Sequence, residues 1–173
     1  MTGSVIPQRM TVDVDHDFIV FLIGMRINKP WKILSWWRAF QPMRPMLREL
    51  DANPHLGCLG YTFGFPVIVQ YWKSFEHLEA YAKASDHLHL PAWKAFNRQV
   101  ANSRGDVGIW HETYFVPAHQ YEAVYSGMPR YGLGMVGRLV PATGRHETAR
   151  NRFKVPLSAN DAPSEPVREA DSL

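Results

Sequence analysis

The run from Phe18 to Met25 constrains the fold of this chain more than any other segment. Its eight residues are all apolar, counting Gly24, and most of them are β-branched or aromatic. A short apolar run of this kind is typical of a strand that is covered on both faces. It is far too short to cross a bilayer, which takes roughly 20 apolar residues. We therefore expect a sheet that buries both of its faces.

The rest of the chain alternates between helical and extended patterns. Pro30 opens a helical region that runs to Leu50, and Pro42 and Pro45 must kink or divide it. The later elements are expected, in chain order, as a strand at 56–63, a strand at 66–73, a helix capped by Ser74, a helix with Pro91 in its first turn, and a strand at 107–116.

This order of elements predicts an α+β, ferredoxin-like fold, in which helices cover one face of an antiparallel sheet. The first and third strands are apolar on both faces, and we expect the rest of the chain to be too short and too polar to cover the second face. A second copy of the same sheet supplies that cover by symmetric face-to-face packing. The sequence therefore predicts a homodimer, assembled as a dimeric α+β barrel.

The folded unit is expected at residues 16–141, with an N-terminal extension at 1–15 and a disordered tail at 142–173. The tail mixes prolines with charges of both signs and holds one aromatic residue, Phe153, so it buries too little apolar area to offset its chain entropy. The extension lacks the blocks of a secretory signal. Together with the lone Cys58, which cannot form an internal disulfide, this predicts a soluble protein of the reducing cytoplasm.

Charge and motifs argue against several classes of function. Lys and Arg number 19 against 16 Asp and Glu, and no run concentrates the net +3, so no nucleic-acid partner is expected. A membrane partner is not expected either, because no segment can span a bilayer. Neither a glycine-rich nucleotide loop in its required context nor a nucleophile elbow occurs. The aromatic share of 13% is the remaining feature, and it fits an apolar pocket.

Two histidines, His87 and His89, lie in the break between the two later helices. As a pair they could hold a metal, but no third ligand has a recognisable spacing, so no metal site is predicted. His89 alone, just before a proline-started helix, lies where an imidazole could take a proton from a phenol or an activated carbon acid. The equally weighted alternative is that His89 only hydrogen-bonds the break.

The helix after the break and the last strand add further candidates. Asn97 lies one helical turn from Trp93 and could orient a substrate oxygen, although a helix-surface role is as consistent with the sequence. His111 and Glu112 face opposite sides of their strand, so only one can enter a given cavity, and His111 is the reserve base. Glu112 then needs a partner, for which Arg26 is the candidate.

Several blocks of the sequence resemble known oxygenases. Tyr71-Trp-Lys-Ser-Phe-Glu-His-Leu-Glu-Ala-Tyr81, followed by His89, is similar to a strand-to-helix junction of antibiotic biosynthesis monooxygenases and of the related haem-degrading monooxygenases. Three further blocks together resemble the signature of the fumagillin-pathway-type monooxygenase family: Gly24–Trp31, His89–Asn97 and Gly105–Tyr114. The resemblance covers residues 18–140.

The resemblance implies a dimeric ferredoxin-like barrel and a monooxygenase of the cofactor-independent type. Its substrate would be a hydrophobic polyketide- or terpenoid-like intermediate of secondary metabolite biosynthesis, with molecular oxygen as co-substrate. The catalytic candidates are then His89, His111 and Asn97, and the substrate-binding candidates are Trp93, Trp72, Tyr81, Arg26 and Tyr114. Trp72 and Trp93 are also typical of core residues.

Two alternatives stay open. Haem-binding relatives carry a histidine at the place of His89 and an aromatic residue at the place of Tyr81, so the resemblance also allows a haem held by His89. The polar residue that those relatives carry on the first strand is missing from Phe18–Met25, which argues against haem degradation. The other alternative is a non-catalytic module that sequesters a small hydrophobic ligand.

Overall fold

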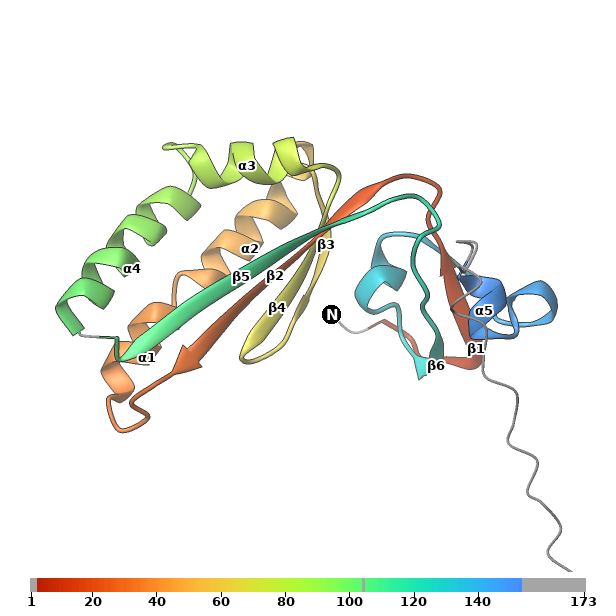
Figure 1. The fold of residues 1–173 in the computed structure, drawn as a ribbon, viewed down its shortest axis with the longest axis horizontal. Coiled ribbons are helices and arrows are strands. Elements are labelled where there is room, and N and C mark those ends of the chain that lie inside the picture. The colour runs from red at the N-terminus through yellow and green to blue at the C-terminus, as the bar shows by residue number, and fades with distance from the viewer. Residues whose placement is uncertain (1–2, 104, 154–173) are drawn as a thin grey trace, which may run out of the picture.

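The larger part of the molecule is built on a four-stranded antiparallel sheet (Figure 1). The computed structural model describes residues 3–103 and 105–153. The strands lie in the order β3-β4-β2-β5, with β2 at Phe18–Ile27, β3 at Cys58–Phe63, β4 at Val67–Trp72 and β5 at Val107–Val116. This is the strand order of a ferredoxin-like fold, so the predicted α+β fold class is confirmed.

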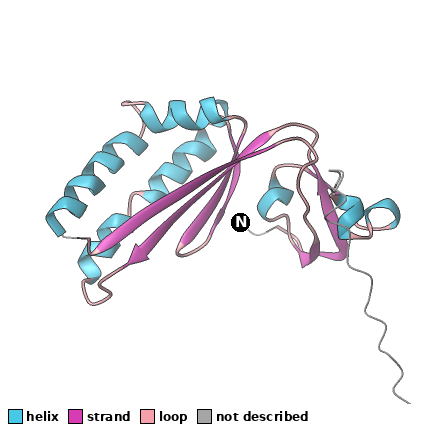
Figure 2. Cartoon of the chain, viewed as in Figure 1, coloured by secondary structure: helices cyan, strands magenta, loops and turns pink. Residues whose placement is uncertain are grey.

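Four helices cover one face of this sheet (Figure 2). They are α1 (Ile33–Phe40), α2 (Met43–Ala52), α3 (Phe75–Lys83) and α4 (His89–Ser103). Pro42 divides α1 from α2 as predicted, because it has no backbone N–H to continue the helix. The Oγ of Ser74 caps α3 by accepting a hydrogen bond from the backbone N–H of His77 at 3.4 Å. Within the described residues, no helix is long and apolar enough to cross a membrane.

The main core lies between the sheet and helices α2 and α3. The sheet contributes Ile19, Tyr61, Ile68 and Trp72, and the helices contribute Leu47, Leu50, Leu78 and Tyr81. Side chains alternate between the two faces along a strand, so the odd-numbered residues of β2 point toward the helices. The odd-numbered residues of β5 share that face, because β5 pairs with β2 in a register that places His111 opposite Ile23.

A smaller three-stranded sheet covers part of the second face. It consists of β1 (Ile6–Asp13) between β6 (Tyr125–Met128) and β7 (Arg138–Pro141). The small sheet and the 3₁₀ turn η2 (Gly132–Met135) share a core with the main sheet, made of Val12, Val14, Phe18 and Leu133. The expectation that this chain could not cover the second face is therefore wrong for the end of the sheet that holds Phe18.

The described fold extends beyond the expected unit of 16–141 at both ends. β1 falls in the expected N-terminal extension, and the turn η3 (Gly144–His146) and the helix α5 (Ala149–Arg152) fall in the expected tail. The guanidinium of Arg152 is buried and donates a hydrogen bond to Glu122 Oε1 at 2.7 Å. Burial of this segment depends on such long-range partners, which composition does not reveal. The remainder of the expected tail, 154–173, lies outside the described residues.

The short turn η1 (Pro54–Leu56) joins α2 to β3.

The other end of the second face is mostly apolar, with Glu112 and Arg26 as charged residues on it, and it is not covered by any part of the described chain. Leu22, Val69, Trp110 and Tyr114 point to this side of the sheet. Trp110 packs on Gly24, where an added Cβ would lie 2.4 Å from the indole, and its ring stays partly accessible. The homodimer stays a prediction, and this area is the surface that it would bury.

Candidate functional site

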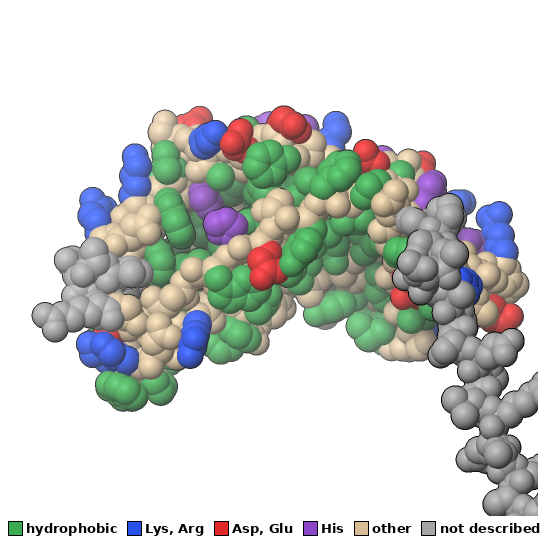
Figure 3. Space-filling model, viewed as in Figure 1, with side chains coloured by type: hydrophobic (Ala, Val, Ile, Leu, Met, Phe, Trp, Pro, Cys, Tyr) green, Lys and Arg blue, Asp and Glu red, His purple; other side chains and the backbone are tan. Residues whose placement is uncertain are grey.

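The helix side of β5 is only partly covered by α4. His111, Thr113 and Phe115 point to this side, and all three are exposed, with 65% of Phe115 accessible to solvent. On α4, which lies over the same side, Trp93 is 38% exposed. Figure 3 shows histidine and hydrophobic side chains at this place, between α4 and β5. We call this area the α4–β5 surface and define it by these four residues together with His89.

His89 begins α4 and is half-buried. Its Nδ1 lies 3.1 Å from the backbone carbonyl oxygen of Ala82 in α3. A carbonyl oxygen can only accept, so Nδ1 must donate, and Nε2 keeps its lone pair. The ring also packs on Tyr81, with the two ring centroids 5.8 Å apart. The hydrogen bond to the helix break is thus confirmed, and it selects the tautomer that can take up a proton or bind a metal through Nε2.

His111 lies beside an apolar cavity on the same side of the sheet. The cavity has a volume of about 40 Å³ and lies between the sheet and helices α1 and α2, where Ile23, Phe40 and Ile109 line it. Ile23 is the direct cross-strand neighbour of His111, so the imidazole lies next to a residue that lines this cavity, although His111 itself does not line it. Its ring packs on Phe21, with centroids 5.6 Å apart. Both histidine candidates therefore lie on the helix side of the sheet.

Trp93 and Asn97 follow His89 along α4. The Trp93 ring stacks on Phe96, with centroids 5.9 Å apart and the planes inclined by 24°. Trp93 thus combines a supporting contact with an accessible apolar edge, as a substrate contact requires. Asn97 is exposed, which agrees with the helix-surface alternative that its sequence position allowed.

Glu49 of α2 is a residue that sequence reasoning missed. Its Oε2 accepts a hydrogen bond from the Tyr81 hydroxyl at 2.8 Å and from the backbone N–H of Leu88 at 3.2 Å, and Nδ1 of His87 lies 3.3 Å from Oε1. Burial raises the pKa of Glu49, but the hydrogen bonds from Tyr81, Leu88 and His87 outweigh burial and lower it below the usual 4.5. Glu49 therefore holds the break between α3 and α4 in place.

Trp72 and Tyr81 are core residues, which corrects their assignment as substrate-binding candidates. Trp72 is 0% exposed, and its Nε1 donates to Oε1 of Gln70 at 2.9 Å. Tyr81 is buried against it, with ring centroids 5.7 Å apart. Burial and the acceptor Glu49 both raise the pKa of the Tyr81 hydroxyl. Neither ring offers surface to a substrate, because both rings are packed between α3 and the sheet.

Arg26 and Tyr114 lie on the second face of the sheet and not on the α4–β5 surface. The predicted opposite orientation of His111 and Glu112 is confirmed by the register. The predicted pairing of Glu112 with Arg26 is wrong, because Arg26 lies opposite Gly108, four residues along β5 from Glu112 or about 13 Å. Glu112 instead accepts a hydrogen bond from the Tyr114 hydroxyl.

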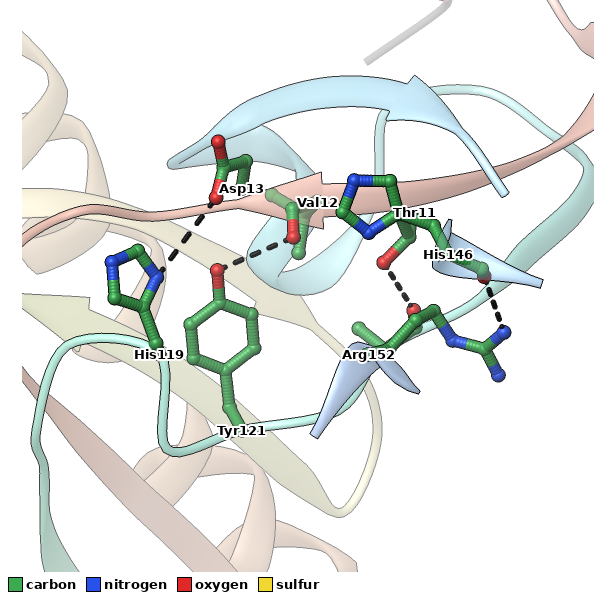
Figure 4. Close-up of a pocket in the computed structure, with 8 residues that line it drawn as sticks. Thr11, Val12, Asp13, His119, Tyr121, His146 and Arg152 are labelled. Carbon is green, nitrogen blue, oxygen red and sulfur yellow. Dashed lines mark hydrogen bonds and ion pairs between the residues drawn. The ribbon is translucent and has the colours of Figure 1, made fainter. Parts of the chain in front are cut away.

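A second, polar pocket lies between β1, the loop before β6, and residues of η3 and α5, and it is closed by hydrogen bonds of its own lining (Figure 4). Its volume is about 10 Å³, which is room for about one water molecule. Thr11 Oγ1 donates to the carbonyl of Ala123 at 2.8 Å, and the Tyr121 hydroxyl donates to the carbonyl of Val12 at 3.2 Å. These bonds tie β1 to the loop that precedes β6, and the pocket leaves no room for an organic substrate.

The donor groups fit a haem better than a bare metal ion. No three His, Cys, Asp or Glu side chains of the described residues are arranged to hold a metal. His87 and His89 hydrogen-bond to different partners, Glu49 and Ala82. A haem needs an iron ligand and apolar surroundings: Nε2 of His89 could supply the ligand, and Trp93, one helical turn along α4, exposes an apolar ring.

Comparison with known proteins agrees with this fold. A family model described as Monooxygenase af470-like matches residues 18–133. No curated protein matches the chain. A crystal structure of aldoxime dehydratase is similar, with a TM-score of 0.51 and 18% sequence identity. That match covers 66% of this chain and 38% of the aldoxime dehydratase chain, so it supports the fold alone.

Proposed function

The chain belongs to the monooxygenase af470-like family, and we propose that it is a cofactor-independent monooxygenase with His89 as its general base. The family match spans the whole main sheet and the four helices that cover it. Membership in this family points to an enzyme. The proposed substrate is a hydrophobic polyketide- or terpenoid-like intermediate of secondary metabolism, with molecular oxygen as co-substrate. The fumagillin-pathway type is likewise part of the proposal.

The hydrogen bond from Nδ1 of His89 to Ala82 carries this proposal. It orients the imidazole and leaves Nε2 with the lone pair that a general base needs. The surrounding residues are suited to an apolar molecule, since Trp93 and Phe115 expose large aromatic surfaces on the same side of the sheet. His111 is the second histidine of the α4–β5 surface and the reserve base.

In the proposed reaction, His89 takes a proton from a substrate methylene that neighbouring carbonyl or aromatic groups make acidic. The resulting carbanion gives one electron to molecular oxygen, and the radical pair combines to a peroxide. The protonated His89 returns its proton to the peroxide, which then loses water and leaves a ketone. One methylene and one oxygen molecule give one carbonyl and one water, so no external reductant is required.

Haem bound through His89 is the second candidate, because the same Nε2 lone pair suits an axial ligand. The haem would supply oxygen activation at its iron. In that case His89 would hold the group instead of acting as a base, and the aromatic side chains of the α4–β5 surface would supply apolar surroundings.

The absorption spectrum and oxygen uptake of the purified protein test these proposals. Anthrone is a suitable probe, since its methylene is acidified by two aromatic rings and a carbonyl. Oxygen uptake with anthraquinone formation and no Soret band supports the cofactor-independent enzyme. A Soret band that accompanies turnover supports the haem enzyme. Binding of anthrone without oxygen uptake would indicate a non-catalytic module and overturn both.

A further inference from the structure

The side of α1 that points away from the sheet exposes large apolar side chains. α1 contains no buried residue. Trp31, just before the helix, is 73% exposed and Leu34 is 71% exposed, while Ile33 and Trp37 are also accessible. Scattered exposed apolar residues are ordinary, but four on two helical turns form a contiguous patch, which marks an interaction surface. We call these four residues the α1 tip.

The patch continues onto the turn between β3 and β4. Phe65 in this turn and Phe63 at the end of β3 are both exposed, and both rings contact Phe40 of α1, with centroid distances of 5.8 and 5.9 Å. Phe40 and Phe65 also line the apolar cavity. The α1 tip therefore lies over one wall of that cavity.

The α1 tip lies in the most basic stretch of the chain. Residues 26–48 hold six of the 19 Lys and Arg and none of the 16 Asp and Glu, so the stretch carries +6 while the rest of the chain carries −3. The expectation that no run concentrates the positive charge is therefore wrong for this stretch. Two of the six, Lys29 and Lys32, contact the buried carboxylate of Asp106 at 2.7 and 2.9 Å. The exposed Arg38 and Arg44 add positive charge along α1 and the start of α2. Figure 3 shows hydrophobic and basic side chains next to each other at the end of the molecule where Figure 1 places α1.

We propose that the α1 tip docks this protein on an anionic membrane surface. Tryptophan prefers the headgroup level of a bilayer, which suits Trp31 and Trp37. A short amphipathic helix with basic flanks lies in the plane of the interface and is attracted by anionic lipids, which suits Arg38 and Arg44. The sequence-based expectation of no membrane partner considered only a segment that spans the bilayer, and an interfacial helix does not need one.

A second copy of the chain fits this patch less well than a membrane does. In a two-fold symmetric contact the same patch meets itself, so the basic residues of the two copies would face each other and repel. An anionic bilayer instead satisfies the apolar and the basic side chains together. Docking in this way brings the apolar cavity behind Phe40 close to the phase in which hydrophobic molecules dissolve. The proposal does not depend on the chemistry proposed for His89.

Co-sedimentation of the full chain with vesicles tests the proposal. We expect binding to phosphatidylcholine vesicles that contain about one third phosphatidylserine, weaker binding to pure phosphatidylcholine, and weaker binding at high salt. The double variants Trp31→Ser/Leu34→Ser and Arg38→Glu/Arg44→Glu should each lower the partition coefficient roughly tenfold or more. The matched controls Phe75→Ser and Arg150→Glu change exposed residues on α3 and α5 and should bind like the wild type.

Quenching of tryptophan fluorescence by brominated lipids gives a second readout that needs no destabilising change. Wild-type fluorescence should be quenched in anionic vesicles, and the variant Trp31→Phe/Trp37→Phe should lose most of that quenching. A wild-type chain that stays in the supernatant, or tip variants that bind as well as the wild type, would overturn the proposal. So would tip variants that only change the oligomeric state, or stronger binding to single-stranded RNA than to vesicles.

Discussion

The Nδ1 atom of His89 lies 3.1 Å from the carbonyl oxygen of Ala82, so a residue of α3 fixes the ring of the first residue of α4. The break between the two helices is itself held by Glu49, which accepts hydrogen bonds from Tyr81 and from the backbone N–H of Leu88. The proposed base is therefore oriented by backbone and buried groups. Pre-organisation of this kind keeps a catalytic group in its working tautomer.

Replacement of His89 by alanine should remove turnover without removing binding. General-base catalysis contributes about 10²–10⁴-fold to a rate, so we expect a loss of that size in oxygen uptake with anthrone. Anthrone affinity should change only a few-fold, because the aromatic side chains of the surface remain. His89→Gln is the matched variant: it can still donate to Ala82 but cannot take up a proton. If His111→Ala loses turnover while both His89 variants keep it, His111 is the base.

Trp72 and Trp93 should respond in opposite ways to the same substitution. Trp72 is completely buried, so Trp72→Ala should lower the free energy of unfolding by about 3–5 kcal/mol. Trp93 is partly exposed, so Trp93→Ala should cost about 1 kcal/mol or less and should mainly raise the KM for the probe substrate. Urea unfolding and steady-state kinetics measure the two effects. A large loss of stability in Trp93→Ala would place Trp93 in the core instead.

The main sheet and its helices could be predicted from the sequence because their signals are local. The apolar run that starts at Phe18 lies within its strand, and Pro42 and Ser74 lie directly before the helices that they start. β1 had no such signal. Its sequence Ile-Pro-Gln-Arg-Met-Thr-Val-Asp is mixed, and it is a strand because it pairs with β6 and β7, more than 100 residues later.

The residues of the candidate site also differ in how far the sequence could predict them. His89 follows a recognisable junction, so both its helix break and its hydrogen bond could be anticipated. Glu49 could not, because it is one of two acids in α2 and its partners Tyr81 and Leu88 lie 32 and 39 residues further along the chain. Trp72 is a substrate-binding candidate by sequence, because sequence alone does not show which aromatic rings are packed in the core.

Removal of the Glu49 carboxylate should destabilise the fold. In Glu49→Ala the buried Tyr81 hydroxyl loses its acceptor, and an unsatisfied buried polar group costs about 1–3 kcal/mol. The control is Glu79→Ala, since Glu79 pairs with Lys83 on the exposed side of α3 and such a pair contributes about 0.5 kcal/mol or less. Urea unfolding of both variants measures the difference. Equal losses would mean that Glu49 does not hold the helix break.

The stabilising effect of Glu49 should be constant near neutral pH and should be lost in acid. Its pKa in the folded protein lies below the usual 4.5, so the folded state favours the charged carboxylate more than the unfolded chain does. The stabilising contribution of the Glu49 carboxylate is fully present above pH 4.5 and is lost as the pH falls through the folded-state pKa. The difference in unfolding free energy between the wild type and Glu49→Gln should therefore stay constant near neutral pH and shrink in acid. A difference that grows in acid would contradict the role of Glu49 as a charged acceptor.

The uncovered part of the second face should hold a second copy of the chain. Leu22 lies in its middle, between Val69 of β4 and Glu112 of β5, and a second carboxylate there would be desolvated beside Glu112 in a face-to-face dimer. We expect sedimentation velocity to show a dimer for the wild type at micromolar concentration and a monomer for Leu22→Glu. Thr113→Glu is the matched control, because Thr113 is exposed on the opposite face of the same sheet, and this variant should stay dimeric. A wild-type chain that sediments as a monomer would rule out the dimer, and the partly covered second face would then be stable in water as it stands.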